Sequence, residues 1–187
     1  MVYLGNWLRI LVILGCNVTF AFGSESDVGS SRSYLNDEYR YSVQVPRPYS
    51  INRSEYGSHG FTVHLDKADV ADIVVFAGYD LGTDPSDPLG AGTNLNLKTA
   101  CPVDWRISIT PPKRTEMKGL PVETVSGVCA GPLKTPDFAF DVVTVSRTFN
   151  GSVVIYGFTL VSALKRADLD RTVFHTLLRS LRFLPAP

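Results

Sequence analysis

The chain has 187 residues, with 18 lysines and arginines against 18 aspartates and glutamates, so its formal net charge is zero. Nucleic-acid-binding proteins carry a basic excess, so this balance argues against a nucleic acid partner and against general attraction to anionic lipid. With 44% hydrophobic residues, the chain is long enough for one domain with its own core.

Residues 1–23 are typical of an export signal. Arg9 precedes an apolar run at residues 10–14, and residues 21–23 place small side chains at both key positions of a cleavage site before Ser24. The run is too short to span a bilayer securely. Cleavage there would leave 164 of the 187 residues and a formal charge of −1, because Arg9 is lost. We expect a periplasmic or secreted protein.

Leu14-Gly15-Cys16 offers an alternative, a bacterial lipoprotein signal that ends before Cys16. The acylated Cys16 would then become the first residue and hold the protein at a membrane surface as an anchored lipoprotein. Contact with a membrane is expected only in this case.

The remaining cysteines support export. Cleavage or acylation removes Cys16 from the count and leaves Cys101 and Cys129. In an oxidising compartment these two are expected to form a structural disulfide, since no neighbouring base or partner suggests a reactive thiol or a metal ligand.

Residues 24–35 are predicted to form a flexible leader, because most of this stretch is rich in Ser, Gly and acidic side chains, and residues 36–187 a single domain. Apolar and polar side chains alternate over residues 39–45 and again over 61–65, which predicts two half-buried strands. Residues 72–79 contain a continuous apolar run and predict a more deeply covered strand.

The following segment, residues 80–104, is the least regular part of the chain. It is rich in Asp-Pro, Gly and Asn turn signals, so we expect a long connection without regular structure. Connections of this length are often functional or disordered. A strand is predicted next, over residues 120–129.

The strongest hairpin signal is Asn150-Gly151, which separates two strands predicted at residues 138–148 and 152–162. The second strand has apolar residues at both its odd and its even positions. Both of its faces are therefore expected to be covered, one of them by a helix.

A C-terminal helix is predicted after Asp168, which suits an N-cap, with Asp170 in the first turn. Residues 183–184 follow as a short closing strand or a frayed tail. The predicted fold class is α+β, an antiparallel sheet of about six strands backed by this helix. The apolar helix face comprises Leu169, Val173, Phe174, Leu177, Leu178 and Leu181.

The order of these elements resembles the Mog1/PsbP-like fold, which is found in many small exported bacterial domains. The resemblance implies a Mog1/PsbP-like sandwich and a non-enzymatic binding or assembly factor, and it implies no particular site. The segments that carry it are Tyr39-Arg40-Tyr41-Ser42-Val43, Gly60-Phe61-Thr62-Val63, Lys118-Gly119-Leu120-Pro121 and Leu177-Leu178-Arg179-Ser180-Leu181-Arg182-Phe183.

Histidines are the main candidates for chemistry. In an extended segment His59 and His64 would point to opposite faces, so they cannot easily share a metal. His64 and Asp66 have i, i+2 spacing and could form a hydrogen-bonded pair in a small hydrolase, but no serine or cysteine lies in a recognisable nucleophile elbow. We therefore expect no catalytic residues, no cofactor and no metal, and we keep the hydrolase as an alternative.

Two surfaces are candidates for contact with a protein partner. The first is the turn-rich segment with Asp84 and Asp87, whose aspartates equally suit turns, a helix cap or a weak cation site. The second is a basic ridge opposite the leucines of the predicted helix, which could receive an acidic protein surface or simply be solvated. The ridge consists of Arg171, His175, Arg179 and Arg182.

The sequence as a whole predicts an exported, non-catalytic protein-binding or accessory module of the cell envelope. The first alternative is a periplasmic immunity or inhibitor protein that blocks a partner enzyme, and the second is the small hydrolase that uses His64 and Asp66. The partner's identity does not follow from the residues.

Overall fold

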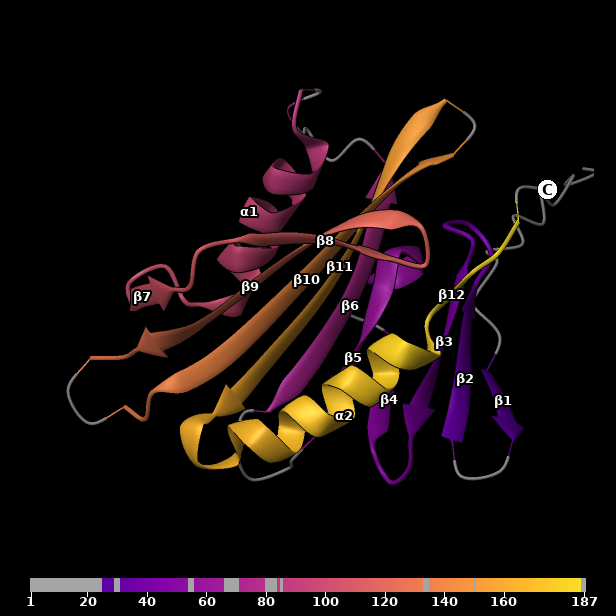
Figure 1. Cartoon of the computed structure of the whole chain (residues 1–187). Coiled ribbons are helices and arrows are strands. Elements are labelled where there is room, and N and C mark those ends of the chain that lie inside the picture. Colours follow the sequence, from indigo (N-terminus) through magenta and orange to yellow (C-terminus); the bar gives the residue numbers. More distant parts are fainter. Residues whose placement is uncertain are drawn as a thin grey trace, which may run out of the picture.

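The computed structural model describes residues 25–28, 31–53, 56–65, 71–79, 84, 86–132, 135–149 and 151–185. It consists of two antiparallel sheets and two α-helices, which confirms the α+β class (Figure 1). The predicted signal segment, Cys16, Asp66 and Asn150 lie outside the described residues. Within the described ranges no helix is long and apolar enough to cross a bilayer.

The larger sheet is built around the predicted hairpin. Its two strands pair antiparallel over their whole length, from Phe138 opposite Ala163 to Phe149 opposite Ser152. The sheet has eight strands where about six were expected. Five of the expected strands belong to it, the strand expected at residues 39–45 lies in the smaller sheet, and three short strands along the edges of the larger sheet carry weak sequence patterns. In spatial order these are β4 (Ser50–Asn52), β5 (Gly60–His64), β6 (Asp72–Tyr79), β11 (Ser152–Ala163), β10 (Phe138–Phe149), β9 (Leu120–Ala130) and β7 (Arg106–Ile109), with β8 (Lys113–Met117) also paired to β9.

The smaller sheet contains β1 (Glu25–Val28), β2 (Ser31–Asn36), β3 (Tyr41–Pro46) and β12 (Arg182–Phe183). The predicted flexible leader over residues 24–35 is therefore wrong where β1 and β2 form. β2 has few apolar residues and is ordered by its ladder with β3 and by the buried ring of Tyr34, which lies 4.2 Å from that of Phe61. Tertiary contacts of this kind leave little trace in local composition.

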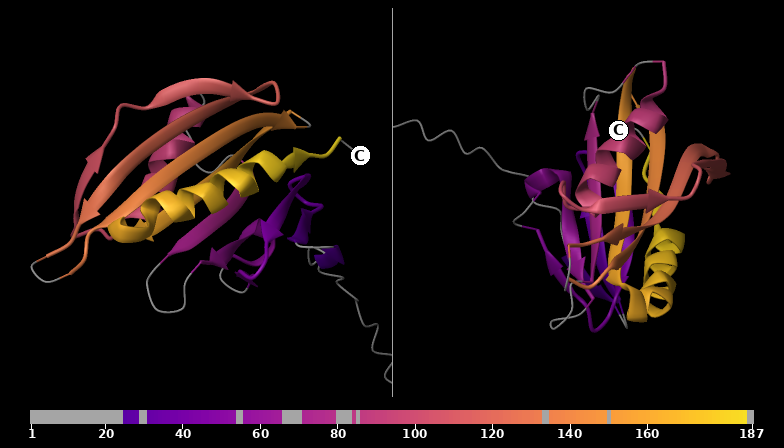
Figure 2. Two further views of the ribbon diagram at one scale, coloured as in Figure 1. Left: turned by 60° about the horizontal axis from the view of Figure 1, so that its bottom comes forward. Right: turned by 90° about the vertical axis from the view of Figure 1, so that its left-hand side faces the viewer.

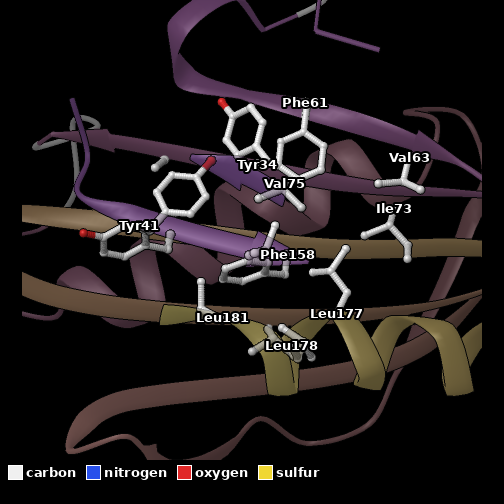
Figure 3. Close-up of a cluster of buried hydrophobic side chains, with 14 of the residues drawn as sticks. Tyr34, Tyr41, Phe61, Val63, Ile73, Val75, Phe158, Leu177, Leu178 and Leu181 are labelled. Atoms are coloured by element: carbon white, nitrogen blue, oxygen red, sulfur yellow. The ribbon is translucent and has the colours of Figure 1, made fainter. Parts of the chain in front are cut away.

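The main core lies between the two sheets, and α2 (Ala167–Ser180) closes it (Figure 3). The side chains that fill it alternate along each strand with side chains on the opposite face, as the period of two requires. Its largest fully buried members include Tyr41, Phe61, Phe158, Phe174 and Leu177. β11 is covered on both faces, as predicted.

α2 begins one residue before the predicted cap. Arg166 occupies the N-cap position without a side-chain hydrogen bond, and Asp168 lies in the first turn. Leu169, which was predicted on the apolar face, is 61% exposed, whereas Asp170 is fully buried. Phe174, Leu177 and Leu178 face the core as predicted.

A second helix, α1 (Pro88–Ala100), occupies the segment that was predicted to be irregular. Asp87 caps it by accepting a hydrogen bond from the Gly90 amide at 3.1 Å, and Pro88 suits the first turn. Gly, Asn and Thr give α1 low intrinsic helix propensity, which explains the wrong prediction. It packs on β9, β10 and β11, on the face opposite α2 (Figure 2).

Small residues allow α1 to lie close to the sheet. A Cβ atom on Gly157 of β11 would lie 2.2 Å from the Asn96 Oδ1 atom of α1. We expect Gly157→Ala to lower the free energy of unfolding by roughly 1–3 kcal/mol, since Asn96 must move and break its 3.0 Å hydrogen bond to Thr144. Urea unfolding would measure the change.

The control for this prediction is a double-mutant cycle. In an Asn96→Ala background the obstructing amide is gone, so the added methyl of Gly157→Ala is expected to cost clearly less than in the native background. Equal costs in both backgrounds would contradict the proposed close approach.

Candidate functional site

Cys101 and Cys129 lie at disulfide distance in the structure. Cys101 follows the last residue of α1, Cys129 lies near the end of β9, and their Cα atoms are 5.8 Å apart. This separation suits a disulfide. Both side chains are buried in a small cluster with Phe140 and Val142 on the α1 face of the sheet. The pair joins the C-terminal end of α1 to the sheet and so positions the chain that follows.

The segment after Cys101 exposes apolar side chains. Val103 is 97% exposed, Ile107 47% and Ile109 48%. We call these three residues the apolar edge. Ile107 lies opposite Cys129 in the β7–β9 register, so the apolar edge continues directly from the cysteine pair.

Trp105 holds this segment against the sheet, with its ring stacked on Phe138 at a centroid distance of 5.4 Å. The apolar edge was not predicted from the sequence, although apolar residues alternate with polar ones at Val103, Trp105, Ile107 and Ile109. That alternation was the available signal for β7.

The backbone of β7 also faces outward. β7 is the terminal strand of the large sheet, and among the described residues no strand pairs with its outer side (Figure 1). β7 and β8 both pair with the same edge of β9, and Pro111 and Pro112 interrupt them. Prolines of this kind limit how far an edge can add further strands. Among the described residues, the unpaired edge on this side of the sheet therefore consists of β7 and, beyond the two prolines, β8, which likewise pairs only with β9.

Asp84 and Asp87, two of the predicted contact residues, have local partners. Asp84 accepts hydrogen bonds from the amide and hydroxyl of Ser86, at 2.8 and 2.7 Å. Asp87 caps α1 and pairs with Arg114 at 2.6 Å, and Arg114 also pairs with Glu123 at 2.6 Å. The Arg114 guanidinium, with help from the Gly90 amide, lowers the pKa of Asp87 below its usual value.

The Asp87 carboxylate thus joins α1 to β8 and β9, and its role as a partner contact stays a prediction. In the part of the chain that the structure describes, no three His, Cys, Asp or Glu side chains gather where they could hold a metal ion.

The histidines make separate contacts. His64 Nδ1 lies 2.8 Å from an oxygen of Asp72, and Asp66, its predicted partner, is outside the described residues. His59 belongs to a single 3-10 turn instead of an extended strand. Its Nδ1 lies 2.8 Å from the Tyr39 hydroxyl, whose pKa is raised mainly by burial.

The four residues of the predicted basic ridge do not form one surface, because they lie in three different environments. Arg171 pairs with Asp141 at 2.7 Å and with Asp168 at 3.3 Å, and the Asp141 hydrogen bond contributes most to its raised pKa. His175 and Arg179 are exposed on α2. Arg182 follows the helix on β12 and lines a pocket together with residues of other strands.

Two hollows were not predicted from the sequence. One, of about 120 Å³, is almost wholly apolar and lies between α1 and strands β6 and β11; Phe76, Leu95 and Thr159 are among its lining residues. The other, of about 460 Å³, contains Arg182. We call it the basic pocket, and it is lined by Lys118, Leu120, Arg147, Arg182 and Phe183.

No protein-family model and no curated protein matches the sequence. Among solved structures, LpqN of Mycobacterium tuberculosis, a protein involved in cell envelope biogenesis, is 14% identical with a TM-score of 0.59, covering 78% of this chain and 83% of its own. Cyanobacterial PsbP (CyanoP) of Synechocystis is 18% identical, with a TM-score of 0.57. The match covers 86% of this chain and 98% of the PsbP chain.

The Ran-binding protein Mog1p of Saccharomyces cerevisiae is 9% identical with a TM-score of 0.51, covering 82% of this chain and 95% of its own. At these identities the likeness concerns the fold. The chain has the Mog1/PsbP-like fold, as the resemblance of its strand and helix segments implied.

Proposed function

We propose that this chain is an exported, non-catalytic accessory module that binds a protein partner through the apolar edge. The observation that carries the proposal is the uneven distribution of exposed apolar side chains. Of the six large apolar side chains exposed among the described residues, three form the apolar edge, Val103, Ile107 and Ile109. These three side chains lie within one short segment of the sequence, and a local concentration of exposed apolar side chains suits contact with a protein.

The cysteine pair supports both export and partner binding through the apolar edge. A disulfide between Cys101 and Cys129 would form in an oxidising compartment, which agrees with the export signal predicted at residues 1–23. The same bond would hold Val103 and β7 in a fixed position before a partner arrives. A preorganised surface loses less conformational entropy on binding.

The neighbours of similar fold agree with an accessory function. LpqN is involved in cell envelope biogenesis, and Mog1p is a Ran-binding protein. We extend from these proteins only the general character, a module of the cell envelope that acts by contact with another protein. The immunity or inhibitor function is a special case in which the partner is an enzyme.

Ile107→Asp is expected to weaken partner binding by at least roughly tenfold, because it places a charge in an apolar contact. The native chain and the variant would be immobilised in their oxidised form and exposed to an extract of the cell envelope. We expect the native chain to retain one stoichiometric partner that Ile107→Asp releases.

The matched control is Leu169→Asp, an equally drastic change at the exposed apolar residue of α2. It should leave partner retention unchanged. Release by Leu169→Asp but not by Ile107→Asp would assign the contact to the α2 surface and contradict the apolar edge. No stoichiometric partner in repeated trials would contradict the function itself.

A further inference from the structure

The basic pocket gathers cations from three separate parts of the chain. Lys118 comes from the turn between β8 and β9, Arg147 from β10 and Arg182 from β12. At about 460 Å³ the pocket falls within the usual volume range of small-molecule sites. None of its five lining residues is acidic.

Contacts of its guanidinium hold Arg147 beside the pocket. One terminal nitrogen donates to the Leu184 carbonyl at 2.9 Å, while Nη1 is buried and has no hydrogen-bond partner among the described residues. The guanidinium carbon lies 5.5 Å from the Phe149 ring centroid and 5.9 Å from that of Phe183. The Arg147 guanidinium also hydrogen-bonds the Tyr156 hydroxyl, so these contacts fix the side chain and leave its positive charge beside the pocket.

Lys118 and Arg182 complete the positive surface. Lys118 has φ +56°, in the left-handed region that non-glycine residues rarely adopt, and its ammonium contacts the Leu181 carbonyl. An ammonium has three donors, so this contact does not exhaust its hydrogen-bonding capacity. Arg182 is exposed, and no described carboxylate forms an ion pair with it.

Two further lining residues are apolar. Leu120 and Phe183 are half-buried, and Phe183 packs edge-on against the buried ring of Tyr156 at 5.0 Å. The pocket therefore combines three cations with an apolar wall. A group with several charged acceptor oxygens on an apolar stem would complement both parts.

We propose that the basic pocket binds an alkyl phosphate group. The phosphate oxygens accept hydrogen bonds from Arg147, Arg182 and Lys118, and the stem lies on Leu120 and Phe183. A phosphate monoester has about two negative charges and three strong acceptor oxygens, which suits a pocket lined by three cations. This site is independent of the apolar edge, which lies on other residues of the sheet.

Hexyl phosphate is a suitable probe, because it carries both chemical parts of the proposed ligand. Titration into the full oxidised chain would be followed by calorimetry and by amide chemical shifts. We expect hexyl phosphate to bind more tightly than inorganic phosphate and hexanol not to bind. Perturbed amides should cluster at the β8–β9 turn, β12 and the Arg147 region.

Arg182→Gln should weaken hexyl phosphate binding roughly tenfold, since it removes one charge-assisted hydrogen bond. Arg179→Gln is the matched control, because it removes an exposed arginine from α2 that does not line the pocket. It should leave the affinity unchanged. Thermal unfolding would verify that both variants are folded.

The proposal is overturned if hexyl phosphate shows no saturable binding at millimolar concentration, if both variants weaken it equally, or if inorganic phosphate binds as tightly. A second experiment distinguishes the sources of the phosphate. Vesicles containing phosphatidic acid that retain the native chain but lose Arg182→Gln would identify a lipid headgroup. Binding of hexyl phosphate without vesicle retention would identify a soluble phosphate ester, and either result supports the pocket.

Discussion

Asp170→Ala is expected to lower the free energy of unfolding by about 3–5 kcal/mol, the largest effect of any single polar substitution discussed for this protein. Asp170 is fully buried in α2, where one oxygen accepts a 2.6 Å hydrogen bond from the Ser162 hydroxyl and the other a 3.1 Å bond from Arg166. Removing the carboxylate takes from the buried Ser162 hydroxyl its shorter hydrogen bond, leaving the one of 3.2 Å to the Ala163 carbonyl, and takes a buried counter-charge from the Arg166 guanidinium.

The Asp170 carboxylate also ties α2 to the end of β11, so its loss loosens the helix that closes the main core. Urea unfolding of the oxidised chain, followed by circular dichroism, measures the effect. Asp170→Asn keeps the side-chain volume and one acceptor oxygen. Its free energy of unfolding should therefore lie between those of the native chain and Asp170→Ala.

Asp168→Ala is the matched control in the same first turn of α2. Its side chain is completely exposed, and its ion pair with Arg171, at 3.3 Å, lies on the surface. Both substitutions lose a similar favourable interaction with the helix dipole, worth about 0.3–1 kcal/mol. Their difference therefore isolates the buried contacts of Asp170. Equal destabilisation by the two substitutions would contradict this account.

Reduction of the Cys101–Cys129 pair is expected to lower the free energy of unfolding by roughly 3–4 kcal/mol. The two cysteines are 28 residues apart, and closing a loop of that length reduces the conformational entropy of the unfolded chain. α1 should respond most, because the bond joins its C-terminal end to β9. Limited proteolysis should cleave near residues 101–105 faster after reduction.

The control is the double variant Cys101→Ser/Cys129→Ser, which should match the reduced native chain and show no response to reductant. The intact mass of the exported protein tests the cellular context at the same time. An oxidised chain that begins at Ser24 supports cleavage, and one that begins with acylated Cys16 supports the lipoprotein alternative. A chain that still begins with Met1 and carries both Cys101 and Cys129 as free thiols would contradict export.

The hairpin of β10 and β11, the strands β3, β5 and β6, and the helix α2 could be predicted from the sequence. β3 and α2 each bury one face, and such burial imposes a period of two on a strand and of 3.6 on a helix, whereas β10 and β11 are covered on both faces and their segments are apolar over long runs. Asn150-Gly151 added a turn signal that is almost independent of the rest of the chain.

α1 and β2 could not be predicted in this way. α1 contains Gly90, Gly92 and two asparagines, and what stabilises it is close packing on the sheet, where a Cβ on Gly92 would lie 2.7 Å from Ile155. β2 is held mainly by its ladder with β3. Both elements depend on partners that are distant in the sequence, so local propensity gave the wrong prediction.

The candidate sites likewise include one that could be predicted from the sequence and others that depend on the tertiary structure. The amino-acid sequence by itself predicted that Cys101 and Cys129 pair, because cleavage or acylation at the predicted export signal would remove Cys16 from the count. Only the tertiary structure decided that Lys118, Arg147 and Arg182 share one pocket and that β7, whose alternating pattern is visible in the sequence, lies at an unpaired edge of the large sheet. The physical reason is that strand pairing, which acts over long sequence separations, brings these side chains together, whereas periodicity reports only which face of its own segment a residue occupies.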